Sequence, residues 1–175
     1  MNKTLLSFLL VVSCTSIVMA QTTPTKKFLS KDKSFEISYP QDWELSKELP
    51  MGVSFLVLTG RQHDSDVFND NVNVLVEDLK GNEVTSEEYG VMCKPMIRKM
   101  ITDYKEVESK KIKLGTRDAY MLVYLGKQGI YALKYNQVIL VEKGKAYIIT
   151  YTCEPPTYNA FIKAFGLIAN SIVIK

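Results

Sequence analysis

The most versatile chemistry in this sequence lies in a short polar loop, residues 60–66, which holds the single histidine of the chain, His63. A Ser-His-Asp triad would have to use that imidazole, because the chain offers no other. Zinc sites built from several imidazoles are excluded for the same reason. No Gly-x-Ser-x-Gly turn occurs to present a nucleophilic serine. A histidine in such a loop is usually solvated, so a hydrolase built around His63 and Asp64 is only the second hypothesis for function.

Oxygen ligands are concentrated just after the histidine, where Asp64, Asp66 and Asp70 stand close together with two asparagines. Hard oxygen ligands at short spacing are what calcium prefers. An EF-hand loop would also need an oxygen ligand at its fifth position and a glycine at its sixth, and Phe68 and Asn69 take those places. A weak divalent-cation or small-ligand site at the three aspartates therefore stands as an alternative to a solvated acidic loop.

Two cysteines, Cys93 and Cys153, follow the first apolar segment of the chain. In an oxidising compartment they could form a disulfide, although sequence spacing does not fix the distance between them. The alternative is two small buried thiols. Lys94 beside Cys93 would lower a thiol pKa, but the apolar neighbours favour packing over catalysis. The sequence also contains no phosphate-binding glycine loop. It therefore predicts no catalytic residue and no cofactor.

The first twenty residues have the pattern of a signal peptide. A single lysine, Lys3, precedes an apolar block that is shorter than the roughly 20 residues needed to span a bilayer. Small residues then precede a cleavage site expected between Ala20 and Gln21. This pattern predicts a secreted or periplasmic protein.

A competing interpretation uses Cys14 as the lipidated cysteine of a bacterial lipoprotein. Val11 and Ser13 fit that motif poorly, since leucine and a small residue such as glycine or alanine usually stand at these positions. Under this alternative the protein would be anchored to the outer face of a membrane, and membrane contact is expected only through that lipid.

Size and charge limit the remaining possibilities. Residues 21–27 are predicted to be a flexible linker, and residues 28–175 have the length of a single domain. The formal net charge of +3 falls by one unit with Lys3, which leaves a nearly balanced chain. A nucleic-acid-binding domain would more often carry a strongly basic face, so nucleic acid is not an expected partner.

Hydrophobic periodicity predicts an α+β fold. Apolar residues alternate or run together at 35–39, 53–58, 71–76, 119–125, 130–141 and 146–153, as they do in strands. Short glycine turns between the last three strands indicate an antiparallel β-sheet meander. Helical spacing follows the capping box of Thr85 and Glu88, running to Tyr104 with a kink or restart at Pro95. The helices are expected to flank the sheet.

Apolar and aromatic residues indicate which surfaces pack. A second helix should follow Pro155, and a short strand should close the chain at 172–174. The helix is predicted to bury Phe161, Ala164, Phe165 and Ile168. Tyrosines occur in pairs four residues apart on the meander strands, so the members of each pair share a face. These faces could be core or an interaction surface, and core is favoured; the pairs are Tyr120 and Tyr124, Tyr131 and Tyr135, and Tyr147 and Tyr151.

Four segments carry a resemblance to a known family. They are residues 35–40 (FEISYP) followed by Asp42 and Trp43, residues 71–76 (NVNVLV), residues 144–151 (GKAYIITY), and the stretch 158–168 before Ser171 and Ile172. In the residues of these segments and in their order, the chain resembles the PsbP and Mog family. That resemblance implies an α-β-α sandwich and a role in binding a larger partner without catalysis. The family includes a subunit of the oxygen-evolving complex, a GTPase-binding protein and many exported bacterial proteins.

The leading hypothesis for function combines the signal peptide with this resemblance. It is an exported, non-enzymatic binding or accessory domain that acts on a protein partner in the cell envelope. The partner and the oligomeric state are left open by the sequence. The hydrolase near His63 and the cation or small-ligand site are the alternatives.

Overall fold

The computed structural model describes residues 25–60 and 67–175, which form ten strands and two helices. The strands are β1 (Thr25–Leu29), β2 (Phe35–Pro40), β3 (Glu44–Leu45), β4 (Val53–Leu58), β5 (Asn71–Asp78), β6 (Thr102–Leu114), β7 (Arg117–Gln128), β8 (Tyr131–Glu142), β9 (Lys145–Cys153) and β10 (Val173–Ile174). The helices are α1 (Ser86–Met100) and α2 (Tyr158–Asn170). Within the described ranges, neither helix combines the length and apolarity needed to cross a bilayer.

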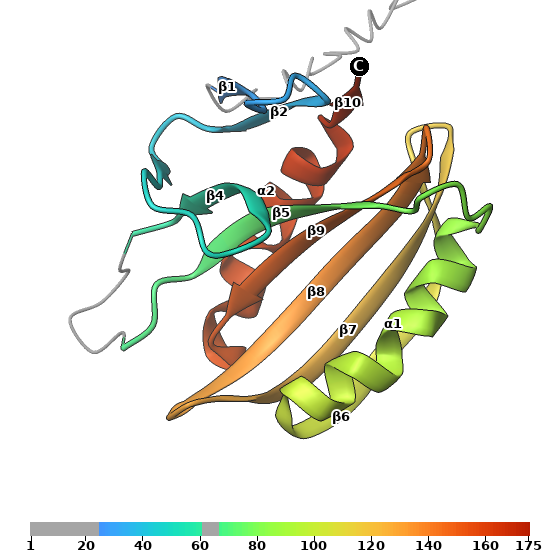
Figure 1. The fold of residues 1–175 in the computed structure, drawn as a ribbon. Helices are drawn as coiled ribbons and strands as arrows, with labels where there is room; N and C mark the ends of the chain where they lie inside the picture. Colours follow the sequence, from blue (N-terminus) through green and yellow to red (C-terminus); the bar gives the residue numbers. More distant parts are fainter. Residues whose placement is uncertain (1–24, 61–66) are drawn as a thin grey trace, which may run out of the picture.

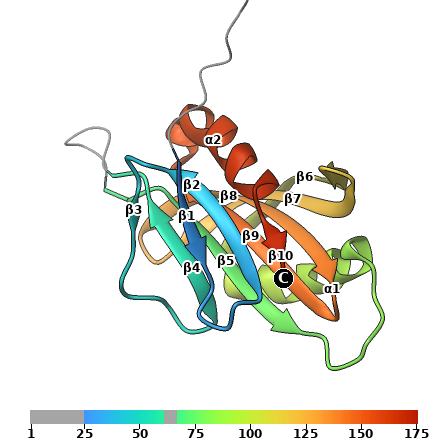
Figure 2. The same ribbon diagram turned by 90° about the horizontal axis from the view of Figure 1, so that it is seen from above.

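The strands form two antiparallel sheets. The larger has seven strands in the order β3-β4-β5-β9-β8-β7-β6, and the smaller has three in the order β1-β2-β10. Strands β6 to β9 are joined by consecutive hairpins, so the predicted meander and the α+β class are confirmed. Figure 1 looks onto one face of the large sheet, with α1 in front and α2 behind, and Figure 2 shows the same layers from above.

The rear face of the large sheet is covered over its central strands. Alternate residues of β9, from Tyr147 to Cys153, point into a core that they share with Phe165 and Ile168 of α2. The small sheet adds to this core, and Phe35 of β2 is wholly buried there. The predicted apolar face of the second helix is confirmed. This core buries most of the large apolar side chains and holds the fold together.

On the front face, α1 contacts mainly β6, β7 and β8. The predicted capping box is present, since Thr85 Oγ1 accepts from the Glu88 backbone while the Glu88 carboxylate accepts from the Thr85 backbone. Pro95 lies inside the helix on its exposed side, and the helix continues through it. Gly90 lets the helix approach the sheet closely, because a Cβ there would fall 2.9 Å from Tyr120 Cε1 and would overlap the ring.

Two sequence predictions are wrong at the edges of elements. The first helix ends at Met100, and Tyr104 lies on the 13-residue strand β6. The charged sequence of this strand does not show a strand pattern. An edge strand rich in lysine and glutamate lacks the apolar alternation that marks a half-buried strand. Residues 25–27, predicted to be linker, belong to β1, where Thr25 pairs with Pro40.

We predict that Gly90→Ala destabilises the protein by about 1–3 kcal/mol, because overpacking against Tyr120 outweighs the helical preference of alanine. The matched control is Gly166→Ala in α2, where an added Cβ meets nothing within 4 Å. That variant should gain up to about 1 kcal/mol. Urea unfolding of both variants measures the difference, and equal stabilities would contradict the close contact.

Candidate functional site

The candidate residues of the polar loop fall on both sides of the described boundary. His63, Asp64 and Asp66 lie outside the described residues, as do Cys14, Ala20 and Gln21 at the N-terminus. Asp70 is described and is 4% exposed. In the described ranges, no three His, Cys, Asp or Glu side chains are grouped closely enough to hold a metal ion.

Asp70 binds other parts of the chain. Its Oδ2 accepts a hydrogen bond from Thr157 Oγ1 at 2.5 Å, and its Oδ1 accepts one from the Glu154 backbone at 3.2 Å. The start of β5 is thereby tied to the turn that leads into α2. Burial raises the pKa of the carboxyl, and the bonds from Thr157 and Glu154 only partly offset it. Both carboxylate oxygens serve the fold, so Asp70 acts as a structural residue here.

The two cysteines lie on opposite faces of the large sheet, so the candidate disulfide between Cys93 and Cys153 does not form. Cys153 is buried in the rear core, Cys93 packs under α1 on the front face, and both thiols are free. Burial raises the pKa of Cys93, and it raises that of Cys153 to about 12. The ammonium of Lys94 does not activate Cys93, because it binds Glu106 at 2.8 Å.

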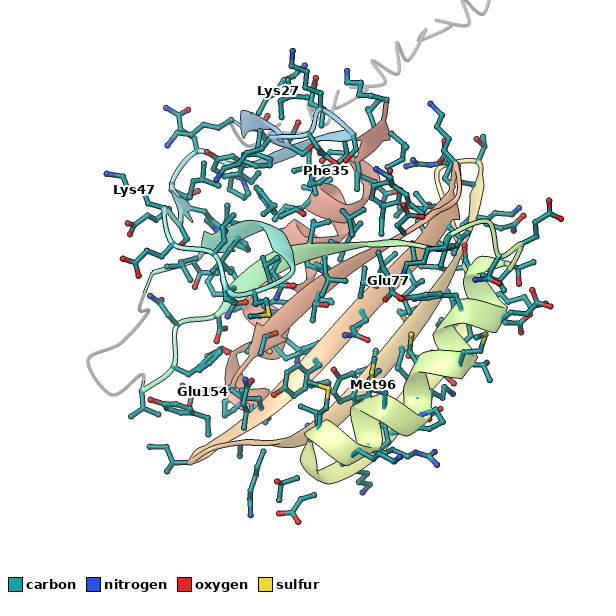
Figure 3. The ribbon with its side chains drawn as sticks, in the orientation of Figure 1. Lys27, Phe35, Lys47, Glu77, Met96 and Glu154 are labelled. Atoms are coloured by element: carbon teal, nitrogen blue, oxygen red, sulfur yellow. The ribbon has the colours of Figure 1, made fainter. Side chains whose placement is uncertain are left out.

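A groove of about 390 Å³ lies on the front face, beside α1. Its floor comes from β5, β9, β8 and β7, and its wall is the sheet-facing side of the helix. In Figure 3, Glu77 of β5 and Met96 of α1 both lie in front of the sheet, on either side of this space. The lining residues are Asn73, Leu75, Glu77, Tyr89, Cys93, Met96, Ile97, Met100, Ile101, Tyr124, Gln128, Tyr135, Gln137, Ile139, Ile148, Thr150 and Thr152.

The groove combines apolar walls with hydrogen-bonding groups on its floor. Thr150 and Thr152 of β9 are only 7% and 6% exposed, and Gln137 donates to Thr150 Oγ1 at 3.4 Å. At one end, the Tyr89 hydroxyl donates to Glu77 Oε2 at 2.6 Å. That bond joins α1 to β5 across the groove. Small-molecule sites commonly pair an apolar lining with a few fixed polar groups in this way.

Sequence reasoning missed the groove, although one signal was present. Asn71 and Asn73 of β5, with Thr150 and Thr152 of β9, are polar residues at two-residue spacing in otherwise apolar strands. They mark the strip of sheet that no helix covers, since a covered strip would carry apolar side chains. The predicted pairing of tyrosines by face is confirmed, because the members of each pair belong to the same cluster: Tyr120 with Tyr124 and Tyr131 with Tyr135 on the front, and Tyr147 with Tyr151 in the rear core.

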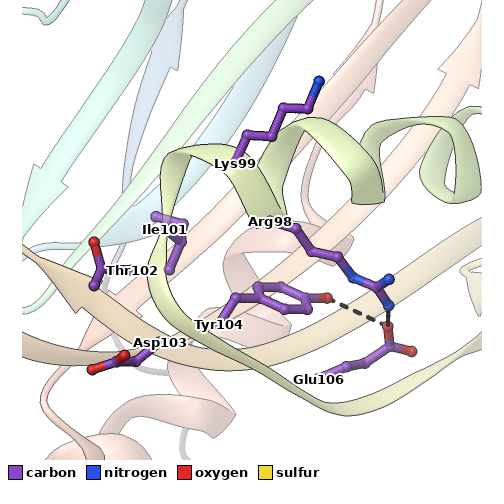
Figure 4. Close-up of a pocket in the computed structure, with 7 residues that line it drawn as sticks. All are labelled: Arg98, Lys99, Ile101, Thr102, Asp103, Tyr104 and Glu106. Atoms are coloured by element: carbon purple, nitrogen blue, oxygen red, sulfur yellow. Dashed lines mark hydrogen bonds and ion pairs between the residues drawn. The ribbon is translucent and has the colours of Figure 1, made fainter.

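A second hollow lies where α1 turns into β6 (Figure 4). The Glu106 carboxylate there accepts from Lys94 at 2.8 Å and from Ser109 at 2.7 Å. The Tyr104 hydroxyl and the Arg98 guanidinium also face it, at 3.3 and 3.8 Å. Hydrogen bonds from Lys94 and Ser109 lower the pKa of Glu106. This network pairs the carboxylate with the two cations around it and holds the helix against β6, so we regard it as structural.

The arrangement of layers is that of the PsbP and Mog α-β-α sandwich. Among solved structures, the chain is similar to cyanobacterial PsbP (CyanoP) from Synechocystis sp. PCC 6803, with a TM-score of 0.63 and 14% identity over 93% of this chain and 98% of that one. It is also similar to the Saccharomyces cerevisiae Ran-binding protein Mog1p, with a TM-score of 0.60 and 10% identity over 87% and 96% of the two chains.

A third similar structure is LpqN of Mycobacterium tuberculosis, which is involved in cell envelope biogenesis. Its TM-score is 0.57, at 12% identity over 89% of this chain and 87% of that one. No protein-family model and no curated protein matches this chain. Identities this low establish the fold, and function has to be argued from the site itself.

We predict that the Asp70 carboxyl makes a pH-dependent contribution to the stability of the folded protein. Its pKa in the folded chain is raised above 3.8, so its contribution is greatest at low pH and is lost as pH rises through the raised value. Asp70→Asn cannot titrate. The stability of the wild type minus that of the variant should therefore fall in urea unfolding as the pH rises from below 3.8 towards neutrality. A difference that grows over that range would contradict the raised pKa.

We also predict that both cysteines are free thiols. A chain that begins at Gln21, unfolded without reductant, should react with a thiol reagent at both Cys93 and Cys153. In the folded protein Cys153 should react slowly, because it is 0% exposed and its thiolate is disfavoured. Recovery of no free thiol after unfolding would mean that a disulfide had formed.

Proposed function

We propose that this chain is an exported, non-enzymatic accessory domain that binds a protein partner in the cell envelope through the front face beside α1. The observation that carries the proposal is a row of exposed methionines along the helix. Met92, Met96 and Met100 are four residues apart and are 66%, 55% and 73% exposed.

Such a row is costly to leave in water and suits an interface. Clustered exposed apolar side chains mark interaction sites, and methionine adapts its shape to a partner more readily than branched residues do. Met96 and Met100 also line the groove, so the row and the cavity form one continuous surface. A partner seated there would cover both.

The titratable groups of the groove favour binding over catalysis. Burial raises the pKa of the Cys93 thiol, which keeps it protonated near neutral pH and weakens it as a nucleophile. Burial and the bond to Glu77 also raise the pKa of Tyr89. A general acid or base works best with a pKa near the operating pH, and these shifts move both groups away from it.

Two further observations support the location and class. Residues 1–20 have the pattern of a signal peptide, and the similar LpqN structure belongs to a protein of cell envelope biogenesis. PsbP and Mog1p, which share the fold, are consistent with an accessory role for this chain. Lipidation at Cys14 stays the alternative to free secretion.

We predict that glutamate at the methionine row weakens partner binding. Burying one methionine contributes about 1.5–3 kcal/mol, so Met96→Glu with Met100→Glu should lower affinity at least about tenfold. The measurement uses a photo-crosslinking amino acid at position 96 or 100 in the exporting cell. A discrete envelope protein should be crosslinked, and the double variant should lose that protein in co-purification.

The control surface is the exposed rear side of α2. Leu167 is 68% exposed there, and Leu167→Glu should leave co-purification unchanged. The same crosslinker at position 167 should give no matching adduct. Failure to form an adduct at positions 96 and 100, or equal adducts at position 167, would contradict the proposed surface.

A further inference from the structure

The interior of the groove carries a single formal charge. Of the residues that line it, Glu77 alone is an acid, and lysine, arginine and histidine are absent from the described lining. Cys93 and Tyr89 are held neutral by their raised pKa values. The cavity is therefore apolar and hydrogen-bonding along its length, with one negative end.

That negative end is available to a ligand. Glu77 is exposed, and within the described residues it forms no ion pair. Its Oε2 accepts the Tyr89 hydroxyl, which fixes the carboxylate at the edge of the floor. Elsewhere in the described part of the chain, carboxylates such as Glu106 and Glu36 have lysine partners. The position of Glu77 favours a cation from outside.

Beside Glu77 the groove offers apolar surface. Leu75 and Ile148 pair with each other next to it on the floor, and Met96 and Met100 follow along the helix. The volume of the groove, about 390 Å³, lies within the roughly 300–1,000 Å³ typical of small-molecule sites. Strands β5, β9 and β8 are hydrogen-bonded on both sides, so the floor offers no unpaired backbone to an added peptide strand. Recognition there is left to side chains.

We propose that this groove binds a small cationic amphiphile, with its ammonium group at Glu77 and its apolar body against Met96, Met100 and Ile148. The ammonium group complements the Glu77 carboxylate, and the apolar body complements the apolar side chains beside it. The neutral amides and hydroxyls of the floor orient polar groups of the ligand without adding charge. This inference shares Met96 and Met100 with the protein-binding surface proposed above, but the probes test it in the absence of any partner.

The test uses three probes with the same eight-carbon chain and different heads: octylammonium, octanol and octanoate. Binding is followed by NMR of the methionine methyl groups. The signals of Met96 and Met100 should shift. That of Met121 should not, because Met121 does not line the groove and alternates on β7 with the front-face residues Tyr120 and Leu122. Octylammonium should bind most tightly and octanoate least.

Variants separate charge from general hydrophobicity. Glu77→Gln keeps an acceptor for the Tyr89 hydroxyl, so the helix remains attached. It should weaken octylammonium binding about tenfold or more and leave octanol binding unchanged. Glu83→Gln removes an exposed charge outside the groove and should alter neither. Equal binding of the three probes, no response to Glu77→Gln, or no shift at Met96 and Met100 would each overturn the proposal.

Discussion

A single helix cannot cover a seven-stranded sheet, and the front of this molecule follows from that constraint. Seven strands about 4.8 Å apart span roughly 30 Å, while a helix with its side chains is about 10–12 Å wide. Two contacts fix where α1 lies: Gly90 against the Tyr120 ring, and Lys94 bound to Glu106. Both hold it over β6 to β8. The strip formed by β5 and β9 is left beside the helix. The groove lies between that strip and the helix.

On the rear face, a helix and a second sheet together provide the cover that one helix alone is too narrow to give. There α2 and the three-stranded sheet together cover the central strands of the large sheet, and side chains such as Phe35, Tyr147 and Ile168 are almost wholly buried. Asp70 joins the start of β5 to the turn before α2. Most of the hydrophobic stabilisation therefore comes from the rear. The front strip can carry polar residues at positions where a core would demand apolar ones.

The fold was largely predictable from sequence because strand periodicity and turn chemistry are local. The capping box of Thr85 and Glu88, the hairpin glycines and the apolar face of α2 each follow from a few neighbouring residues. Strand β6 was not predictable in the same way, since an edge strand faces solvent and carries charge. The exposure of the methionine row was not predictable, because helical spacing identifies a stripe without showing which stripe meets the sheet. That depended on Gly90, whose close contact with Tyr120 is a tertiary fact.

The site was least predictable because it depends on what is left uncovered. Glu77 has ordinary neighbours in sequence, and its importance arises only when Tyr89 of the helix reaches it across the sheet. A carboxylate in that position could be paired by a lysine of the same chain, as Glu106 is. Its lack of an ion pair among the described residues, together with the neutral groups around it, gives the groove a single charge with apolar side chains beside it. A surface with that polarity selects ligands by their own polarity, which neither the fold nor the core requires.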